Sequence, residues 1–253
     1  MKHKFFIHFF GAAVITFLVL ANLSPDPARA GWKEAQDAYD AKDYKTAFKE
    51  YLPLAEAGES DAQFWIGNMY RFGLGRTINY KKTVYWFFRA AENGDIAVIG
   101  DLGYMAGKGQ GMKASKNKEI CFYRLAAERG YRDAQWNLYM NLSDSFFTIT
   151  EANEWLKRAV KQGQDNALAR QGALLIVDPL NFDKTEGLMY LVLAQKYGDD
   201  PEVDEYIDEI VGNNPSRKKE LERAKVLANK WKSTEEPDPQ NIPAPDIKKC
   251  LNA

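Results

Sequence analysis

Residues 62–75 read AQFWIGNMYRFGLG, and residues 86–94 read WFFRAAENG. The first stretch returns 36 residues later, where Gly67, Met69, Gly73 and Gly75 have their counterparts in Gly103, Met105, Gly109 and Gly111. Two glycines that flank one residue end a helix and turn the chain, because glycine adopts left-handed backbone angles without strain. The repeating unit is therefore predicted to be a helix, a Gly-x-Gly loop, a second helix and a glycine turn.

The second helix of each unit carries an aromatic residue and, one helical turn later, an alanine, so both face the same way. This pair occurs four times, at Trp86 and Ala90, Phe122 and Ala126, Trp155 and Ala159, and Tyr190 and Ala194. The pattern predicts aromatic rings between stacked helix pairs. The third and fourth units have lost the Gly-x-Gly loop.

Helix starts follow the same division of the chain. Asn79 and Ser115 precede second helices as N-cap residues. Thr148 with Glu151, and Asp183 with Glu186, match the capping-box pattern. Asn214 followed by Pro215 predicts the start of a last helix, since proline is tolerated in a first turn.

Residues 62–75 and 86–94 resemble the Sel-one-like repeat, a relative of the tetratricopeptide repeat. The resemblance is strong over residues 58–94, good over 95–130, weaker over 131–163 and marginal over 164–198. It implies an all-α fold, a right-handed superhelix (solenoid) of antiparallel helix pairs, and an adaptor role in which the concave face binds other proteins. The predicted organisation is a capping helix pair (31–57), repeats (58–198), C-terminal capping helices (199–232) and a proline-rich disordered tail (233–253).

The first 30 residues have the features of a secretory signal. Lys2 and Lys4 precede an apolar stretch, and the segment closes on the small-residue triplet Ala28-Arg29-Ala30. We expect cleavage after Ala30 and export to the periplasm or the medium, which leaves no membrane span. The alternative is an uncleaved anchor that would tether a membrane-bound scaffold.

The composition excludes several function classes. The chain has 34 basic and 35 acidic residues, so no basic excess favours nucleic-acid binding. Its two histidines, His3 and His8, both lie in the predicted signal, so the exported chain lacks the imidazole of Ser-His-Asp or Cys-His catalysis. Two cysteines without histidine do not make the usual zinc site. We therefore expect a monomer without metal, cofactor or catalytic activity.

Two serines keep an enzymatic alternative open. Ser115 with Lys118, and Ser216 with Lys219, match the Ser-x-x-Lys motif of penicillin-binding enzymes. The companion S-D-N and K-T-G motifs are missing from the sequence. Both serines stand where helices are predicted to begin, which favours helix capping over a cell-wall or β-lactam activity.

Cys121 and Cys250 form a disulfide in an oxidising compartment or remain a buried and an exposed thiol; the sequence leaves both open. The acidic residues between Asp199 and Glu209 crowd one helix, a pattern typical of a solvated face, with docking of a basic partner as the alternative.

The resemblance implies that the first helix of each pair lines the concave face. Counted from Gly67 and Tyr70, the inward positions form an apolar strip with a polar rim, as at protein interfaces. We predict that this strip binds a protein or peptide partner; the alternative is that several of its residues are buried between helices. The predicted binding residues are Phe64, Asn68, Arg71, Tyr104, Lys108, Trp136 and Met140, with Asp61, Phe72 and Asp133 beside them.

Overall fold

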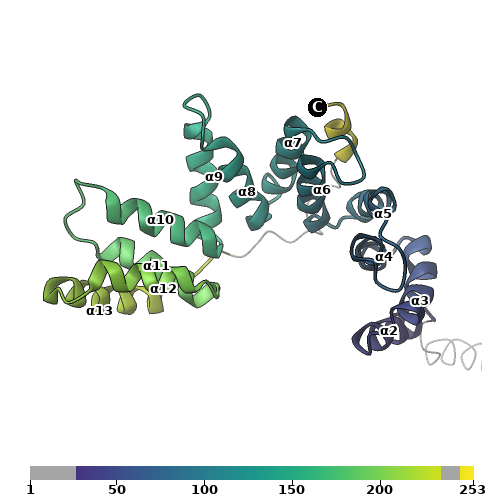
Figure 1. Ribbon diagram of the computed structural model, residues 1–253, viewed down its shortest axis with the longest axis horizontal. Helices are drawn as coiled ribbons and strands as arrows, with labels where there is room; N and C mark the ends of the chain where they lie inside the picture. Colours follow the sequence, from purple (N-terminus) through teal and green to yellow (C-terminus); the bar gives the residue numbers. More distant parts are fainter. Residues whose placement is uncertain (1–26, 235–245) are drawn as a thin grey trace, which may run out of the picture.

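The computed structural model describes residues 27–234 and 246–253, and throughout these ranges the regular elements are helices. Between residues 27 and 197, consecutive helices pack as antiparallel pairs that follow one another along an arc (Figure 1). The predicted all-α solenoid is confirmed. In chain order the helices are α2 (Pro27–Asp40), α3 (Tyr44–Ala57), α4 (Ser60–Phe72), α5 (Tyr80–Glu92), α6 (Ala97–Lys108), α7 (Lys116–Ala127), α8 (Arg132–Leu142), α9 (Ile149–Lys161), α10 (Asp165–Val177), α11 (Thr185–Tyr197), α12 (Pro201–Val211), α13 (Pro215–Lys230) and the 3-10 helix η2 (Ile247–Asn252).

The Gly-x-Gly loops between the helices of a pair are needed for stacking as well as for turning. All four loop glycines have positive φ. A Cβ on Gly75 would lie 2.8 Å from the backbone carbon of Tyr44, and one on Gly111 would overlap the carbonyl oxygen of Tyr80. Tyr44 and Tyr80 open the second helix of the preceding pair and stand 36 residues apart. The second glycine of the motif therefore lets each loop touch the pair before it.

A second glycine position brings the two helices of a pair together. A Cβ on Gly67 in α4 would lie 2.5 Å from the ring of Phe87 in α5. The equivalent Gly103 in α6 faces Tyr123 in α7, with a separation of 3.0 Å. Gly172 in α10 likewise leaves no room before Leu191 in α11. Small residues on first helices thus receive large side chains from second helices, which is close packing at native density.

The aromatic residues that recur on second helices lie in the core, as predicted. Trp86, Phe122 and Trp155 are buried, and Tyr190 is half-buried against the same core. Trp86 belongs to a cluster formed by the first pairs, and the other three belong to the cluster that continues along the stack.

Buried glutamines link neighbouring pairs through hydrogen bonds. The side-chain amide of Gln63 donates to the carbonyl of Ala55 at 2.9 Å, and its oxygen accepts from Asn93 at 2.9 Å. Gln135, two repeats later, donates to the carbonyl of Ala127 at 3.2 Å and accepts from Gln162 at 3.0 Å. These bonds satisfy carbonyl groups at the ends of second helices, which have no partner within their own helix.

The predicted N-caps of α5 and α7 are confirmed, and α9 begins directly after Thr148 as predicted, but its capping box is not formed. Asn79 accepts from the N–H of Lys82 at 3.0 Å, and Ser115 from that of Lys118 at 3.3 Å, as N-cap residues do. Thr148 makes no capping bond: its hydroxyl donates to the carbonyl of Leu142 at 2.6 Å. Its expected partner in the capping box, Glu151, accepts from Arg124 and Trp155 instead.

The other capping box is also absent. The carboxylate of Asp183 accepts from the N–H of Thr185, only two residues on, and α11 begins at Thr185. Asn214 caps α13 as predicted, through bonds from the N–H groups of Ser216 and Arg217.

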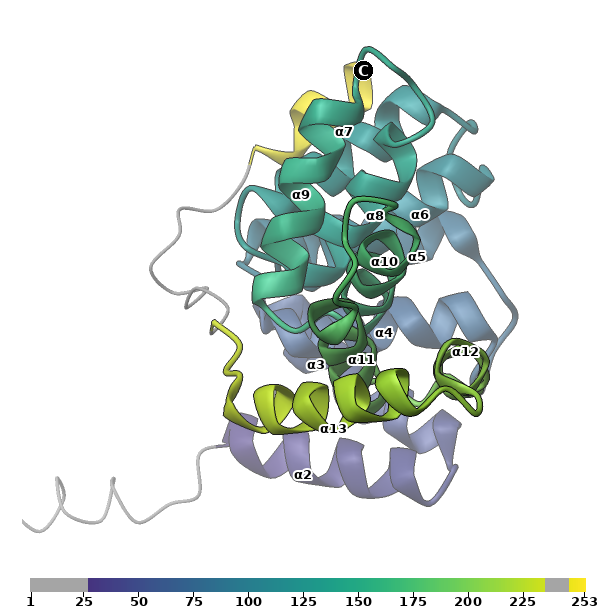
Figure 2. The same cartoon turned by 90° about the vertical axis from the view of Figure 1, so that its left-hand side faces the viewer.

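The structure describes part of the predicted C-terminal tail and little of the predicted N-terminal signal. Residues 1–26 and 235–245 lie outside the described residues, and with them most of the predicted signal and the proline-rich stretch. Residues 247–252, predicted as disordered tail, form η2 beside α7 (Figure 2). The same segment also contacts α5. Ile247 and Cys250 are buried there, which gives this segment the apolar burial that its sequence composition did not suggest.

Candidate functional site

The first helices α4, α6 and α8 present equivalent positions at the repeat spacing, and together they form a surface that we call the A-helix face. Asn68, Tyr104 and Met140 occupy one such row. Asn68 is 8% exposed, whereas Tyr104 is 42% and Met140 49% exposed. The row therefore has its accessible apolar surface on α6 and α8.

Two cations hold the exposed ring of Tyr104 in place. The guanidinium of Arg71 lies 5.6 Å from the Tyr104 ring centroid and 5.2 Å from that of Phe72, while the ammonium of Lys108 lies 5.9 Å from Tyr104. Arg71 also donates to Asp101 at 2.7 Å across the α4–α6 boundary. These five residues form a connected unit, which we call the Tyr104 cluster.

Two aromatic residues of the predicted strip are less accessible than Tyr104. Phe64 is half-buried and stacks on Phe87, with ring centroids 6.0 Å apart and planes 13° apart. Trp136 is half-buried, and its ring lies 5.3 Å from that of Tyr139 on the same helix. Both pack against the core and offer a partner less surface than Tyr104 does.

Carboxylates gather where α4 and α6 begin. Asp95 accepts from the N–H groups of Ala97 and Val98 at 2.9 and 3.4 Å and so caps the first turn of α6. Burial raises the pKa of Asp95 above its ordinary value, and the nearby charges of Asp61 and Asp101 add to that rise, against the lowering effect of the two backbone bonds. This end of the A-helix face is thus negative, whereas its other end carries Arg71 and Lys108.

The two serines of the enzymatic alternative lie at the starts of different helices, α7 and α13. The Ser115 hydroxyl accepts the capping bond of α7. Ser216 is exposed in the first turn of α13, in an open surface depression with Lys218, Lys219, Glu222 and Arg223. Asn214 caps this helix, so the capping role expected for Ser216 is not observed. Within the described ranges no group of three or more His, Cys, Asp or Glu side chains is arranged to hold a metal ion.

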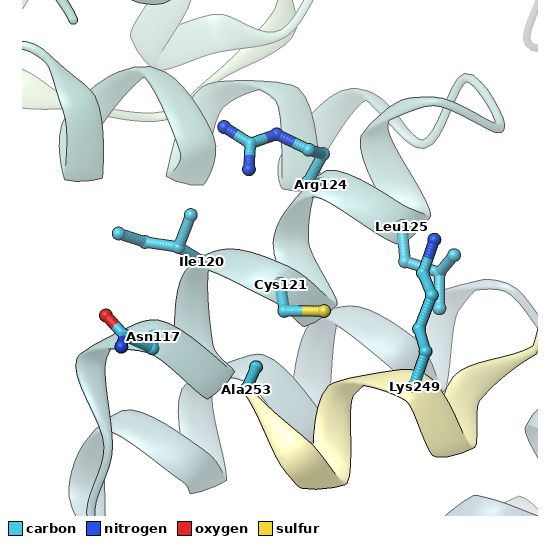
Figure 3. A pocket seen from close by; sticks show the side chains of 7 residues that line it. All are labelled: Asn117, Ile120, Cys121, Arg124, Leu125, Lys249 and Ala253. Atoms are coloured by element: carbon cyan, nitrogen blue, oxygen red, sulfur yellow. The ribbon is translucent and has the colours of Figure 1, made fainter.

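Cys121 in α7 and Cys250 in η2 form a disulfide that joins residues 129 apart in sequence. A pocket of about 450 Å³ opens beside it, lined by α7 and by the C-terminal segment (Figure 3). Arg124 and Lys249 border this pocket. Burial alone would raise the pKa of Glu151, yet the bonds that Arg124 and Trp155 donate to it outweigh burial and lower that pKa.

Exposed apolar side chains outside the predicted strip occupy the loops that have lost Gly-x-Gly. Phe146 and Phe147 between α8 and α9, and Leu180 and Phe182 between α10 and α11, are almost fully exposed. The loss of the glycines was the sequence signal for these exposed side chains, because large residues stand in these loops where the other loops have glycines. Asp101 was also missed, since its role depends on Arg71 in the preceding unit.

Comparison with known proteins agrees with this geometry. The family model of the Sel1 repeat matches residues 60–95, 101–131 and 149–164. These parts of the chain are Sel1 repeats. The matched segments cover α4 and α5, then most of α6 and all of α7, then all of α9. The units before residue 60 and after residue 164 continue the stack with more divergent sequences.

Solved structures share the fold at low sequence identity. A Sel1 repeat protein from Oxalobacter formigenes superposes with a TM-score of 0.67 at 24% identity, covering 85% of this chain and 92% of that one. A protective antigen of uropathogenic Escherichia coli strains, with an SLR fold, gives 0.60 at 22% identity; the match covers 87% of this chain and 49% of the antigen. A Pseudomonas aeruginosa protein gives 0.51 at 19% identity, covering 81% and 82%. None of the helices in the described part of this chain combines the length and apolarity that a bilayer span requires.

Proposed function

We propose that this Sel1 repeat protein is an exported scaffold, without catalytic activity, whose A-helix face binds a segment of another protein. Sel1 repeats form scaffolds for protein interaction, which supports the general role. The observation that carries the proposal is the Tyr104 cluster, an exposed aromatic ring between two cations, with the exposed Met140 on the next first helix.

The cluster has the features of an interface anchor. Protein interfaces favour aromatic side chains, methionine and arginine at their centres, with polar groups around them. Arg71 is bound to Asp101 and lies over Tyr104, so the ring is restrained before a partner arrives. A restrained anchor loses less conformational entropy on binding than a mobile one.

Export is the second part of the proposal. The basic start, apolar stretch and Ala28-Arg29-Ala30 triplet of the sequence support it. The packing of α2 depends on Trp32, Ala35 and Tyr39, all of which follow Ala30, so cleavage there keeps these contacts. The test is the intact mass of the protein from the producing cells: loss of residues 1–30 supports export, and a retained N-terminus on a membrane-bound protein refutes it.

The binding role is tested by site-specific photo-crosslinking in the producing cells. A photoreactive residue replaces Tyr104 in one strain and Tyr85 in another; Tyr85 is a comparably exposed tyrosine on the second helix α5. We expect a discrete protein adduct from position 104 that is absent from position 85. Equal adducts from both positions, or none from position 104, would contradict the proposal.

Once the adduct identifies the partner, purified proteins give the quantitative test. Replacing both Tyr104 and Met140 by alanine is expected to weaken the affinity for the partner by about a hundredfold. The reason is that the loss of one interface hot spot costs about 1 to 2 kcal/mol of binding free energy. Tyr85→Ala is the matched control and should leave affinity unchanged. The far-UV circular dichroism of all variants should agree, because these side chains are exposed.

A further inference from the structure

The described residues on either side of 235–245 contact two different parts of the stack. Beyond α13, the N–H of Thr234 donates to the carbonyl of Lys161 at the end of α9 with a length of 2.8 Å, and Trp231 packs edge-on against Tyr197 of α11. The residues from Asp246 onward lie instead beside α7 (Figure 2) and also contact α5, two pairs nearer the N-terminus.

The segment is amphipathic over a single turn. A 3-10 helix has three residues per turn, so residues three apart lie on one side. Ile247 and Cys250 have this spacing and are both buried, whereas Lys248, Lys249 and Leu251 between and after them are exposed. The buried surface of η2 therefore comes from one isoleucine and one cysteine side chain.

The non-covalent contacts of η2 are few. Lys248 pairs with Glu92 of α5 at 2.8 Å, but both side chains are largely exposed, and exposed ion pairs contribute little. Among the residues that the structure describes, no main-chain hydrogen bond joins Ile247–Asn252 to α5 or α7. One buried isoleucine and an exposed ion pair do not offset the conformational entropy lost by six ordered residues.

We propose that η2 is a latch held closed by the Cys121–Cys250 disulfide, and that a dithiol reductant opens it while the helix pairs stay folded. The inference concerns the C-terminal segment alone and does not depend on the binding role of the A-helix face. Opening uncovers the apolar side chains of Ile120 and Leu125 on α7, which border the pocket beside the bond.

The pocket also provides the route for reduction. Cys121 is partly exposed and lines the pocket (Figure 3). Cys250 is fully buried. A thiolate of the dithiol attacks the sulfur of Cys121, and Cys250 leaves as a thiolate that takes up a proton. The second thiolate of the dithiol attacks the mixed disulfide, Cys121 leaves and is protonated, and the dithiol ends as a disulfide.

Hydrogen exchange on the full chain tests the latch, with dithiothreitol as the reductant. In the oxidised protein the amides of residues 247–252 should be protected, and reduction should accelerate their exchange at least about tenfold while α7 keeps its protection. Cys250→Ser should reproduce the reduced state without reductant. Lys248→Ala, which removes only the ion pair, should retain the protection of the oxidised protein.

Three results would overturn the proposal. The first is protection of residues 247–252 that survives reduction, because non-covalent contacts would then suffice. The second is loss of far-UV circular dichroism on reduction, since the bond would then hold up the helix pairs themselves. The third is a disulfide-linked dimer on a non-reducing gel, which would place Cys250 on a second molecule.

Discussion

Because α4 and α5 approach each other closely at Gly67, we expect Gly67→Ala to destabilise the protein, although helix propensity alone predicts that it stabilises. Alanine is favoured over glycine inside a helix by about 1 kcal/mol, so Gly67→Ala would stabilise the protein if the site were open. The site is closed, because a Cβ there would lie 2.5 and 2.6 Å from two ring carbons of Phe87.

The cost follows from how far the ring must move. Ordinary contacts of this kind are 3.4 to 4 Å, so the Phe87 ring has to shift by about 1 Å. The ring is fully buried and stacked on Phe64, which leaves it no free space. Overpacking of this degree costs about 3 kcal/mol, and after the gain in propensity we expect a net loss of about 2 kcal/mol.

Two further glycines supply an internal scale. At Gly103 the separation from Tyr123 is 3.0 Å, so the smaller displacement roughly cancels the gain in propensity and stability should hardly change. At Gly31 the nearest atom is 3.9 Å away. This residue lies inside α2 as long as residues 1–30 are retained, so in the uncleaved chain alanine should stabilise by up to about 1 kcal/mol.

Urea and thermal unfolding followed by far-UV circular dichroism measure the three variants. A loss of 2 kcal/mol corresponds to a fall of about 4 to 8 °C in Tm for a chain of this size. The reasoning is refuted if Gly67→Ala is as stable as Gly31→Ala, because the contact between α4 and α5 would then not restrict the side chain at position 67.

Three other features lead to predictions. Breaking Cys121–Cys250 frees a loop of 129 residues, so reduction should lower the free energy of unfolding by up to about 5 kcal/mol in the chain-entropy model; equal urea midpoints with and without dithiol would contradict this. The raised pKa of Asp95 means that the folded state holds its proton more tightly than the unfolded state, so stability falls as pH rises from the ordinary value of 3.8 through the raised one. Asp95→Asn keeps the capping oxygen and should be more stable than the wild type at neutral pH, and this difference should vanish in acid. Identical unfolding curves of the two proteins across that pH range would show that burial does not destabilise the charged carboxylate. Gly111→Ala should cost at least about 2 kcal/mol, because it combines a positive φ with overlap on Tyr80, whereas Gly94→Ala, which has positive φ and open space around it, should lose only about half as much. Equal unfolding midpoints for these two variants would exclude the contact between loop and preceding pair.

The repeat positions could be predicted from the sequence because each is determined by the backbone conformation or the helix spacing of its own unit. Gly73 and Gly75 need left-handed backbone angles, and Trp86 and Ala90 share a helix face by spacing alone. Such features do not depend on the sequence of the next unit, so their predictions agree with the structure.

Contacts between distant residues were less predictable. Thr148 stands at the sequence position of a capping residue, yet its hydroxyl donates to the carbonyl of Leu142. The carboxylate of Glu151 accepts from Arg124 of the preceding pair instead of completing the capping box. Trp136 fits the spacing of an exposed strip, but the equivalent position in the unit before it is Gly100, and no count along one helix shows how deep the ring will lie. The segment 247–252 folds only because Cys121, far away in sequence, supplies a bond.

The covalent link between α7 and η2 also changes how the protein bears mechanical load. Tension applied between α2 and a handle attached after Ala253 passes from α7 through the sulfur atoms to Cys250. Helices α8 to α13 lie outside that path, so they carry none of the force until the bond is reduced. Single-molecule pulling should therefore extend only the N-terminal pairs of the oxidised protein, and the whole stack once a reductant is added.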